Sequence, residues 1–354
     1  MLVKLDAREL KDVLDVMDEM DSSLVYLHFL DRDYAHVFGT SGDVEVFAKV
    51  TCSTEGYELG RLIALNKRRL TDIVKDFVGD SSFVVFDVEG DNANVRIGND
   101  VLMLKVEKPA ENESFIIPAD IEMYQFSVEA FARALDHVIY ASSYSDAVYI
   151  ANGQVFYGCD GYRLAKYEER VFPDAVSDML SIPVSSAKLL VKAAGIYGKI
   201  GSVGVLDGVL VVGVDKIKIG VKCGGWHDFE LVSAGSLKGC ERIVNVDTKV
   251  FISALMQVKD VVKSKYVEVE VLSDGIRLNA RYDTGALNGV GKVCSRVNVF
   301  KDMFDVQSLI HALEPIKDAM VELRCYSDDE LGSCISMRAN GGKYEAVVMG
   351  VNLD

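Results

Sequence analysis

The chain has 354 residues, of which 49% are hydrophobic, and a formal net charge of −16 at pH 7. This length fits two or three domains, and no hydrophobic run reaches the about 18 residues of a membrane span, so we expect no membrane association. The acidic balance predicts that the surface as a whole repels nucleic acid, because non-specific binding to phosphates depends on lysine and arginine.

The start of the chain and its cysteines indicate where the protein works. Residues 1–6 lack the basic and then hydrophobic layout of a signal peptide. Seven cysteines are scattered without any C-x-x-C spacing, which favours reduced thiols over disulfides or structural zinc. We therefore expect a cytoplasmic protein.

One pattern recurs six times along the chain. It consists of a hydrophobic residue, then Asp, Asn or Ser, then hydrophobic residues five and nine positions after the first. It starts at positions 5, 65, 126, 184, 246 and 304, with spacings of 60, 61, 58, 62 and 58 residues. The second position is typical of a helix N-cap, whose side-chain oxygen accepts a hydrogen bond from a first-turn amide. The pattern predicts helices capped by Asp6, Asn66, Ser127, Ser185, Asp247 and Asp305.

The segments between these helices read as antiparallel strands. Residues 215–222 and 266–271 alternate between hydrophobic and polar side chains. Turn signals such as Asn152-Gly153 and Asp207-Gly208 separate the strand candidates. The hydrophobic residues of each helix fall on one face, which can pack on a sheet. The repeated unit is therefore one helix followed by three or four strands.

Two such units make a domain of ordinary size. The sequence thus predicts an α+β chain of three similar domains, with boundaries near 120 and 241: residues 1–120, 121–240 and 241–354. Similar domains joined head to tail describe an arc, and an arc with unlike ends closes into a ring when a second copy supplies the other half. We expect a homodimer.

Two segments resemble a known family. Residues 156–165, Phe-Tyr-Gly-Cys-Asp-Gly-Tyr-Arg-Leu-Ala, resemble the middle-domain signature of the bacterial β sliding clamp, the β subunit of DNA polymerase III. Cys159 and Tyr162 depart from the Thr and His that are usual there. Residues 344–353 are similar to the closing strand and tail of that family.

The tail departs from the family where Gly350, Val351 and Asn352 replace Pro, Met and Arg. The resemblance covers the full sequence. It implies a dimer of three-domain subunits, with helices lining a central hole and sheets outside. It also implies a DNA sliding clamp, a processivity factor that encircles double-stranded DNA without sequence specificity. Such a clamp tethers a DNA polymerase and has a clamp loader as a further partner.

The resemblance also implies one pocket per subunit for a partner peptide with hydrophobic anchors. Its residues would be Gly161, Tyr162, Arg163, Leu164, Val232, Tyr266, Ser333, Val348, Met349 and Leu353. The alternative for Leu164 and Val348 is a place in the strand core. The departures in the signature and the tail favour a variant peptide.

Basic residues on three of the expected helices are the candidates for contact with phosphates. They are Lys67, Arg68, Arg69, Lys188, Lys192, Lys199, Lys259 and Lys263. The alternative is that these charges are solvated helix faces. The first helix is acidic and ends in Asp18, Glu19, Met20 and Asp21, where the family usually has a basic residue that contacts DNA. We expect poor binding to short linear DNA, because enclosure needs only a weak, salt-screened lining.

The family's arrangement also suggests the dimer contacts. Val101, Leu102 and Leu104 of the first domain would meet the helix end at Val261 and Val262 of the third.

An enzyme is the main rival class, and the sequence argues against it. The five histidines have no metal-ligand spacing, and no G-x-S-x-G elbow is present. Residues 289–293 lack the spacing and the Ser or Thr of a phosphate-binding loop. We expect no catalysis, no cofactor and no metal. A second rival is a clamp-fold scaffold that binds partners without encircling DNA, and the acidic first helix is its best argument.

Overall fold

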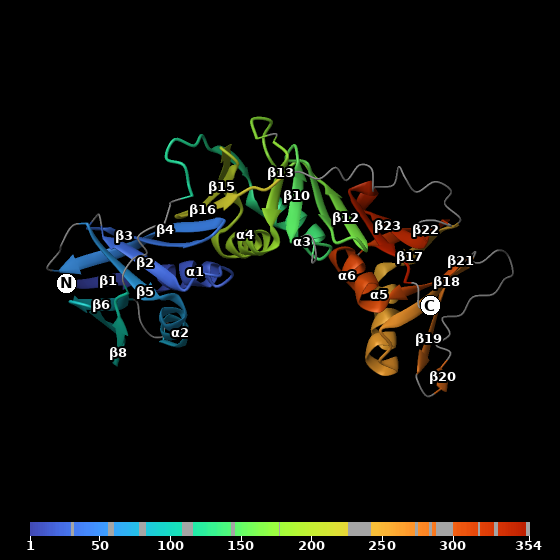
Figure 1. Ribbon diagram of the computed structural model, residues 1–354, viewed down its shortest axis with the longest axis horizontal. Coiled ribbons are helices and arrows are strands. Elements are labelled where there is room, and N and C mark those ends of the chain that lie inside the picture. The colour runs from blue at the N-terminus through green and yellow to red at the C-terminus, as the bar shows by residue number, and fades with distance from the viewer. Residues whose placement is uncertain are drawn as a thin grey trace. The chain divides into compact units, whose positions relative to one another are not determined.

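A computed structural model describes residues 1–29, 32–55, 60–77, 83–107, 116–142, 146–176, 178–225, 242–272, 275–282, 285–287, 300–317, 319–328 and 332–351. The chain divides into two compact units. Unit 1 comprises Met1–Ala132 and Val171–Gly225, and unit 2 comprises Arg133–Arg170 and Trp226–Asp354. Figure 1 shows the chain, with many of its elements labelled.

Six α-helices lie in the described ranges: α1 (Ala7–Met17), α2 (Lys67–Phe77), α3 (Val128–Ile139), α4 (Val184–Tyr197), α5 (Thr248–Gln257) and α6 (Val306–Leu313). Short turns follow in unit 2: η1 (Val258–Val262) continues α5, η2 (Glu314–Ile316) continues α6, and η3 is Asn340–Gly342. Among the described helices, none is both long and hydrophobic enough to cross a bilayer.

Five of the six predicted helix caps are confirmed. Asp6, Asn66, Ser127, Asp247 and Asp305 each precede a helix directly. Each side-chain oxygen accepts a hydrogen bond from the amide three residues later, at 2.7 to 3.2 Å. A cap of this kind satisfies a first-turn amide that would otherwise lack a partner.

The sixth predicted cap, Ser185, is wrong. Helix α4 begins one residue earlier, at Val184, and its N-cap is Pro183, which makes no side-chain capping bond. The proline ring holds φ at −56°, close to the helical value, so the chain can turn into the helix directly after it. Ser185 therefore lies inside the first turn.

Each helix is followed by three or four strands, as predicted. The strands of unit 1 are β1 (Leu2–Asp6), β2 (Leu24–Phe29), β3 (Tyr34–Ser41), β4 (Val44–Glu55), β5 (Arg61–Asn66), β6 (Phe83–Glu89), β7 (Asn92–Ile97), β8 (Asp100–Lys105), β9 (Tyr124–Ser127), β13 (Leu180–Pro183), β14 (Ile200–Leu206), β15 (Val209–Val214) and β16 (Ile217–Lys222). Those of unit 2 are β10 (Ala147–Ala151), β11 (Val155–Cys159), β12 (Arg163–Glu168), β17 (Arg242–Asp247), β18 (Tyr266–Leu272), β19 (Gly275–Tyr282), β20 (Gly285–Leu287), β21 (Phe300–Asp305), β22 (Met320–Asp328), β23 (Gly332–Ala339) and β24 (Tyr344–Met349).

A large antiparallel sheet organises unit 1. Its main path runs β8-β7-β6-β1-β4-β16-β15-β14-β9, and β2, β3 and β5 extend it beside β4. Strand β16 pairs with β4, with Ile217 opposite Ala48, so two segments far apart in sequence share main-chain hydrogen bonds. Helix α1 lies against α2 and α4. Its predicted inner face is confirmed, because Leu10 and Leu14 are buried.

A strap of residues 116–123 lies against one face of this sheet. The amides of Ile116 and Ile117 donate to the Glu45 carboxylate on β4, at 2.6 and 2.9 Å. A Cβ added at Gly220 would lie 2.6 Å from Ile117 Cγ1, and one added at Gly204 would collide with the carbonyl oxygen of Glu122. The strap can approach the sheet this closely because glycine stands at both positions.

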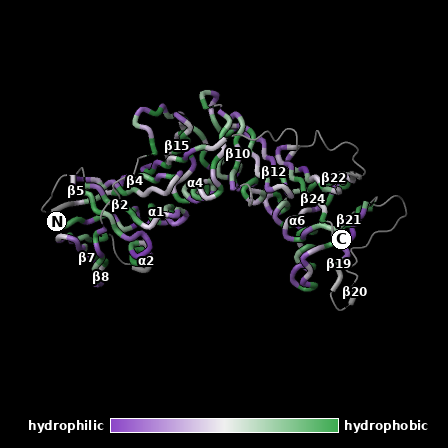
Figure 2. The backbone as a smooth tube through the Cα atoms, in the orientation of Figure 1, coloured by the Kyte–Doolittle hydropathy of each residue, from purple (hydrophilic) through white to green (hydrophobic). Residues whose placement is uncertain are grey.

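Unit 2 contains two antiparallel sheets. Strands β10-β11-β12-β24-β23-β22-β17 follow one another in the first, and β20-β19-β18-β21 form the second. Strand β12 pairs with β24, with Arg163 opposite Val348 and Leu164 opposite Val347. Helix α5 lies against α6, and α6 against β24. In Figure 2, hydrophobic and hydrophilic residues alternate along the strands and helices, as expected for elements with one buried face.

Candidate functional site

The turn between β11 and β12 is built around Asp160. Its Oδ1 accepts hydrogen bonds from the amides of Tyr162, at 3.1 Å, and Arg163, at 2.9 Å. Between them, Gly161 has φ of +87°, a conformation that favours glycine. The signature motif in residues 156–165 therefore encodes an Asx turn.

The Arg163 side chain holds this turn to helix α6. Its Nε donates to Asp160 Oδ2 at 2.9 Å, and its Nη1 lies 3.3 Å from His311 Nδ1. Because a guanidinium can only donate, His311 Nδ1 accepts. Burial, and secondly the charge of Arg163, lower the pKa of His311, which favours the neutral ring. The Asp160 and Arg163 side chains are only 1% and 10% exposed, so this charge pair serves the fold.

The end of β24 lies beside the same turn. The N–H of Met349 donates to the carbonyl of Tyr162 at 3.0 Å, and that of Gly350 donates to the carbonyl of Ser333 at 2.8 Å. Proline, the residue expected from the family at position 350, has no N–H and could not make the second bond. A Cβ at Gly350 would also collide with Ser333 Oγ. The departure at this position thus lets the chain stay paired with β23.

The structure brings seven of the ten predicted pocket residues together: Gly161, Tyr162, Arg163, Leu164, Ser333, Val348 and Met349. Tyr162 is 67% exposed and is the large aromatic at this surface. Tyr266 lies on β18 in the second sheet. The chain end reaches that sheet through Val351, whose N–H donates to the carbonyl of Met303 on β21 at 2.8 Å. Val232 and Leu353 lie outside the described residues.

Two of these residues are buried core positions. Leu164 is 4% exposed and belongs to a hydrophobic cluster with Tyr157, Tyr326 and Val347, against which Met349 packs. Val348 is 1% exposed. Because side chains alternate along a strand, Leu164 and Arg163 point to opposite faces of the sheet. Gly161 and Tyr162 are therefore the exposed residues of the seven, whereas Leu164 and Val348 belong to the core.

An open depression lies elsewhere in unit 2. It has a volume of about 610 Å³ and is lined by Lys249, Ile252, Ser253, Met256, Glu314 and Lys317. Four of these residues come from α5, Glu314 begins η2 and Lys317 follows it, and none is a predicted pocket residue.

Most of the predicted DNA-facing residues are exposed: Arg68, Arg69, Lys188, Lys199, Lys259 and Lys263. Lys67 differs, being only 8% exposed. Its ammonium donates to the carbonyls of Met17, at 2.9 Å, and Met20, at 2.5 Å, which caps the C-terminal end of α1. Burial lowers the pKa of Lys67. Two of the three N–H groups of the Lys67 ammonium are therefore bound to the backbone at the end of α1, and the side chain is buried.

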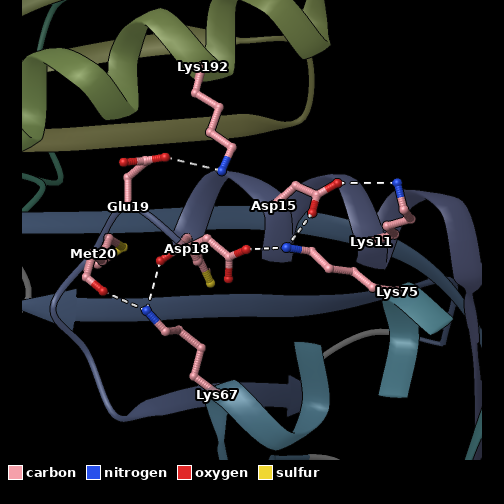
Figure 3. Close-up of polar contacts among 9 residues, drawn as sticks. Lys11, Asp15, Asp18, Glu19, Met20, Lys67, Lys75 and Lys192 are labelled. Atoms are coloured by element: carbon pink, nitrogen blue, oxygen red, sulfur yellow. Dashed lines mark hydrogen bonds and ion pairs between the residues drawn. The ribbon is translucent and has the colours of Figure 1, made fainter. Parts of the chain in front are cut away.

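The carboxylates at the end of α1 hold lysines from two other helices (Figure 3). We call Asp15, Asp18 and Glu19 the first-helix carboxylates. Lys75 of α2 pairs with Asp15, at 3.2 Å, and with Asp18. Lys192 of α4 pairs with Glu19, at 3.3 Å. The sequence shows the acidic helix but not these pairs, because their partners lie far apart along the chain.

The expected dimer residues lie on strand β8 and on the η1 turn that follows α5. Val101 and Leu102 are exposed on β8, the edge strand of its sheet, whereas Leu104 is buried. Val261 is exposed and Val262 half-buried in η1, at the end of α5.

Comparison with solved structures gives matches along the whole chain. They include the DNA polymerase III β subunit of Thermotoga maritima, with a TM-score of 0.84 and 16% identity, and the DNA polymerase sliding clamps of Bacillus subtilis, with 0.80 and 14%, and Caulobacter crescentus, with 0.80 and 18%. Each match covers 100% of both chains. No protein-family model matches the sequence, and no curated protein matches it in sequence. The structural matches confirm the α+β clamp fold that the sequence predicts.

Proposed function

We propose that this chain, whose fold is that of the bacterial β sliding clamp, is itself a DNA sliding clamp subunit. It would encircle double-stranded DNA as a homodimer in the cytoplasm and tether a replicative DNA polymerase, acting by enclosure and without catalysis or a cofactor. The observation that carries the proposal is the full-length match of fold, at a TM-score of 0.84 over 100% of both chains. A chain that had kept only a partner-binding part of a clamp would match over part of its length.

The three-domain division at about 120 and 241 is part of this proposal. Two strand pairings support it, because they would be the joins between successive domains. Strand β4 pairs with β16, and β12 pairs with β24. The dimer would close head to tail, with the exposed Val101 and Leu102 of edge strand β8 against the end of α5 at Val261 of the second copy.

The partner-peptide pocket would lie at the turn between β11 and β12 and the end of β24. Its expected residues remain Gly161, Tyr162, Arg163, Leu164, Val232, Tyr266, Ser333, Val348, Met349 and Leu353. The exposed ring of Tyr162 would provide the contact surface, while Arg163 and Asp160 would hold the turn in shape. A clamp loader and a polymerase would insert a peptide with hydrophobic anchors here.

The DNA-facing set would comprise Arg68, Arg69, Lys188, Lys192, Lys199, Lys259 and Lys263. Their exposure supports this assignment for all except Lys192, which is half-buried; Lys199 and Lys263 lie just after helical segments. Contacts of this kind would be sequence-independent and salt-sensitive.

Loading onto nicked circular DNA tests the proposal. With a clamp loader and ATP, the protein should stay on the circle through gel filtration and leave it when the circle is cut. Its solution mass should be that of a dimer of the 38.9 kDa chain, with an annular particle shape. A monomer, or a protein that is equally well retained on linear DNA, would refute enclosure.

A clamp-fold scaffold that binds partners without encircling DNA is the second candidate. The first-helix carboxylates favour it, because Glu19 places negative charge beside Lys192, which belongs to the DNA-facing set. A scaffold would bind the partner peptide but would not be retained on the circle.

A further inference from the structure

One lysine of α2 and one lysine of α4 pair with carboxylates at the end of α1 within unit 1. Lys192 lies 3.3 Å from Glu19, and Lys75 pairs with both Asp15 and Asp18. Figure 3 shows these side chains converging on the end of α1 from two sides. A phosphate at this surface would therefore meet lysines with a carboxylate next to them.

The carboxylates are held in place by a buried contact. The Lys67 ammonium bonds the carbonyls of Met17 and Met20, which bracket Asp18 and Glu19 in the sequence. This cap fixes the backbone turn that carries both carboxylates. The backbone that carries Asp18 and Glu19 is thus held by a contact separate from their ion pairs.

The ion pair between Lys192 and Glu19 is weak enough for the lysine to exchange between Glu19 and a phosphate. The side chains of Lys192 and Glu19 are 33% and 38% exposed, and an ion pair this accessible to water contributes little to stability. A lysine that leaves Glu19 for a phosphate exchanges one anion for another, so the net gain is small. It also leaves Glu19 close to the phosphate, and like charges repel.

We propose that the first-helix carboxylates act as a built-in competitor for DNA phosphates, holding Lys75 and Lys192 back so that duplex binding by this face is weak. The inference rests on the proposed function, because it takes the partner to be a DNA duplex at this helix face. It adds a way of keeping the affinity of this helix face for DNA phosphates low, which suits a protein that must slide along the duplex.

A double-mutant cycle between Glu19 and Lys192 tests the proposal. The measurement is the dissociation constant of a short linear duplex over a series of salt concentrations, for the full-length protein. Glu19→Gln is expected to tighten binding roughly two- to five-fold, the scale of one exposed ion pair. It should steepen the slope of log K against log salt by about 0.9, the value for one more phosphate contact. Lys192→Gln should cost little in the wild type and remove the whole gain in the Glu19→Gln background.

The matched control is Asp207→Asn, which removes the same charge at the turn between β14 and β15. Its backbone φ of +51° is one that asparagine tolerates. The proposal is overturned if Glu19→Gln binds no tighter than Asp207→Asn, or if Lys192→Gln costs as much in the wild type as in the Glu19→Gln background. Asp18→Asn repeats the test at Lys75, and melting curves establish that each variant is folded.

Retention on nicked circular DNA separates this inference from the proposed function. If the wild type is retained but the cycle shows no coupling, the competitor is refuted and the clamp stands. If coupling is found without retention, the clamp is refuted while the competition for phosphates stands.

Discussion

The main-chain N–H of Met349 donates a hydrogen bond to the carbonyl oxygen of Tyr162 at 3.0 Å. This contact joins the end of the last strand to the turn that carries the signature motif. The backbone of Tyr162 is therefore fixed on both sides, by Met349 and by the Asp160 carboxylate, while 67% of the residue remains exposed. A rigid backbone that presents an exposed aromatic ring is suited to binding a peptide at low entropic cost.

Tyr162→Ala is expected to weaken binding of a peptide with Leu and Phe anchors by about 5- to 30-fold, or about 1–2 kcal/mol, the scale of an aromatic hot spot. The unfolding temperature should hardly change, because the ring is mostly exposed. Fluorescence anisotropy with a labelled peptide measures the affinity. Tyr34→Ala is the control, since Tyr34 is also exposed but lies in unit 1. Equal effects of both substitutions would argue against a site at the turn.

Asp160→Ala is expected to lower the free energy of unfolding by about 3–5 kcal/mol, because it leaves the Arg163 guanidinium buried without its carboxylate. It also removes the acceptor for two amides of the turn. Asp160→Asn keeps an oxygen for those amides and should cost less. Chemical denaturation followed by circular dichroism checks the order of the two variants. If both cost the same, the turn amides contribute nothing beyond the charge.

Lys67→Met is expected to destabilise the protein by about 1–3 kcal/mol, because the carbonyls of Met17 and Met20 lose their buried donor. Affinity for a short DNA duplex should change little, as the ammonium points inward. Arg68→Met should do the opposite, since Arg68 is exposed: stability unchanged and duplex binding weaker. Thermal melts and salt titrations separate the two. A Lys67→Met variant with normal stability and poor duplex binding would return Lys67 to the DNA-facing set.

The strap predicts a dependence of stability on pH. Burial raises the pKa of Glu45 above its ordinary value of 4.5, against the opposing effect of the two strap amides. The contribution of the protonated carboxyl to stability is complete below pH 4.5 and is lost as the pH rises through the raised pKa of the folded state. Glu45→Gln keeps an acceptor and stays neutral. Its melting temperature relative to wild type is therefore expected to rise between pH 4.5 and 7.

The control for this pH series is Glu129→Gln, an exposed glutamate in the first turn of α3. We expect the difference in melting temperature from wild type to change more with pH for Glu45→Gln than for Glu129→Gln. A constant difference between Glu45→Gln and wild type across the whole pH range would show that the Glu45 carboxyl does not titrate differently in the folded and unfolded states.

Local chemistry made much of this fold predictable from the sequence. An N-cap residue bonds an amide only three residues later. Asp6, Asn66 and Asp247 therefore predict their helices from the local sequence alone. The cap at Ser185 failed for an equally local reason, because Pro183 can begin a helix without a capping side chain. Strand alternation at residues 266–271 predicted β18 in the same way.

Contacts between distant segments could not be predicted. The sequence places Lys67 among basic neighbours on a helix, and nothing in that neighbourhood shows that its ammonium reaches back to α1. The pairs of Lys75 and Lys192 with the first-helix carboxylates depend on how three helices pack. The hydrogen bond between Arg163 and His311 could not be predicted either, because the two residues are far apart in the sequence and meet only in the folded chain.

The glycines beneath the strap restrict how this protein can change over evolution. A side chain at Gly220 needs the space that Ile117 fills, and one at Gly204 meets the backbone of Glu122. A larger residue at Gly220 is thus acceptable only together with a smaller residue at Ile117. Positions 220 and 117 should therefore co-vary among relatives, whereas position 204 should stay glycine, because a smaller side chain in the strap does not relieve a contact with its backbone.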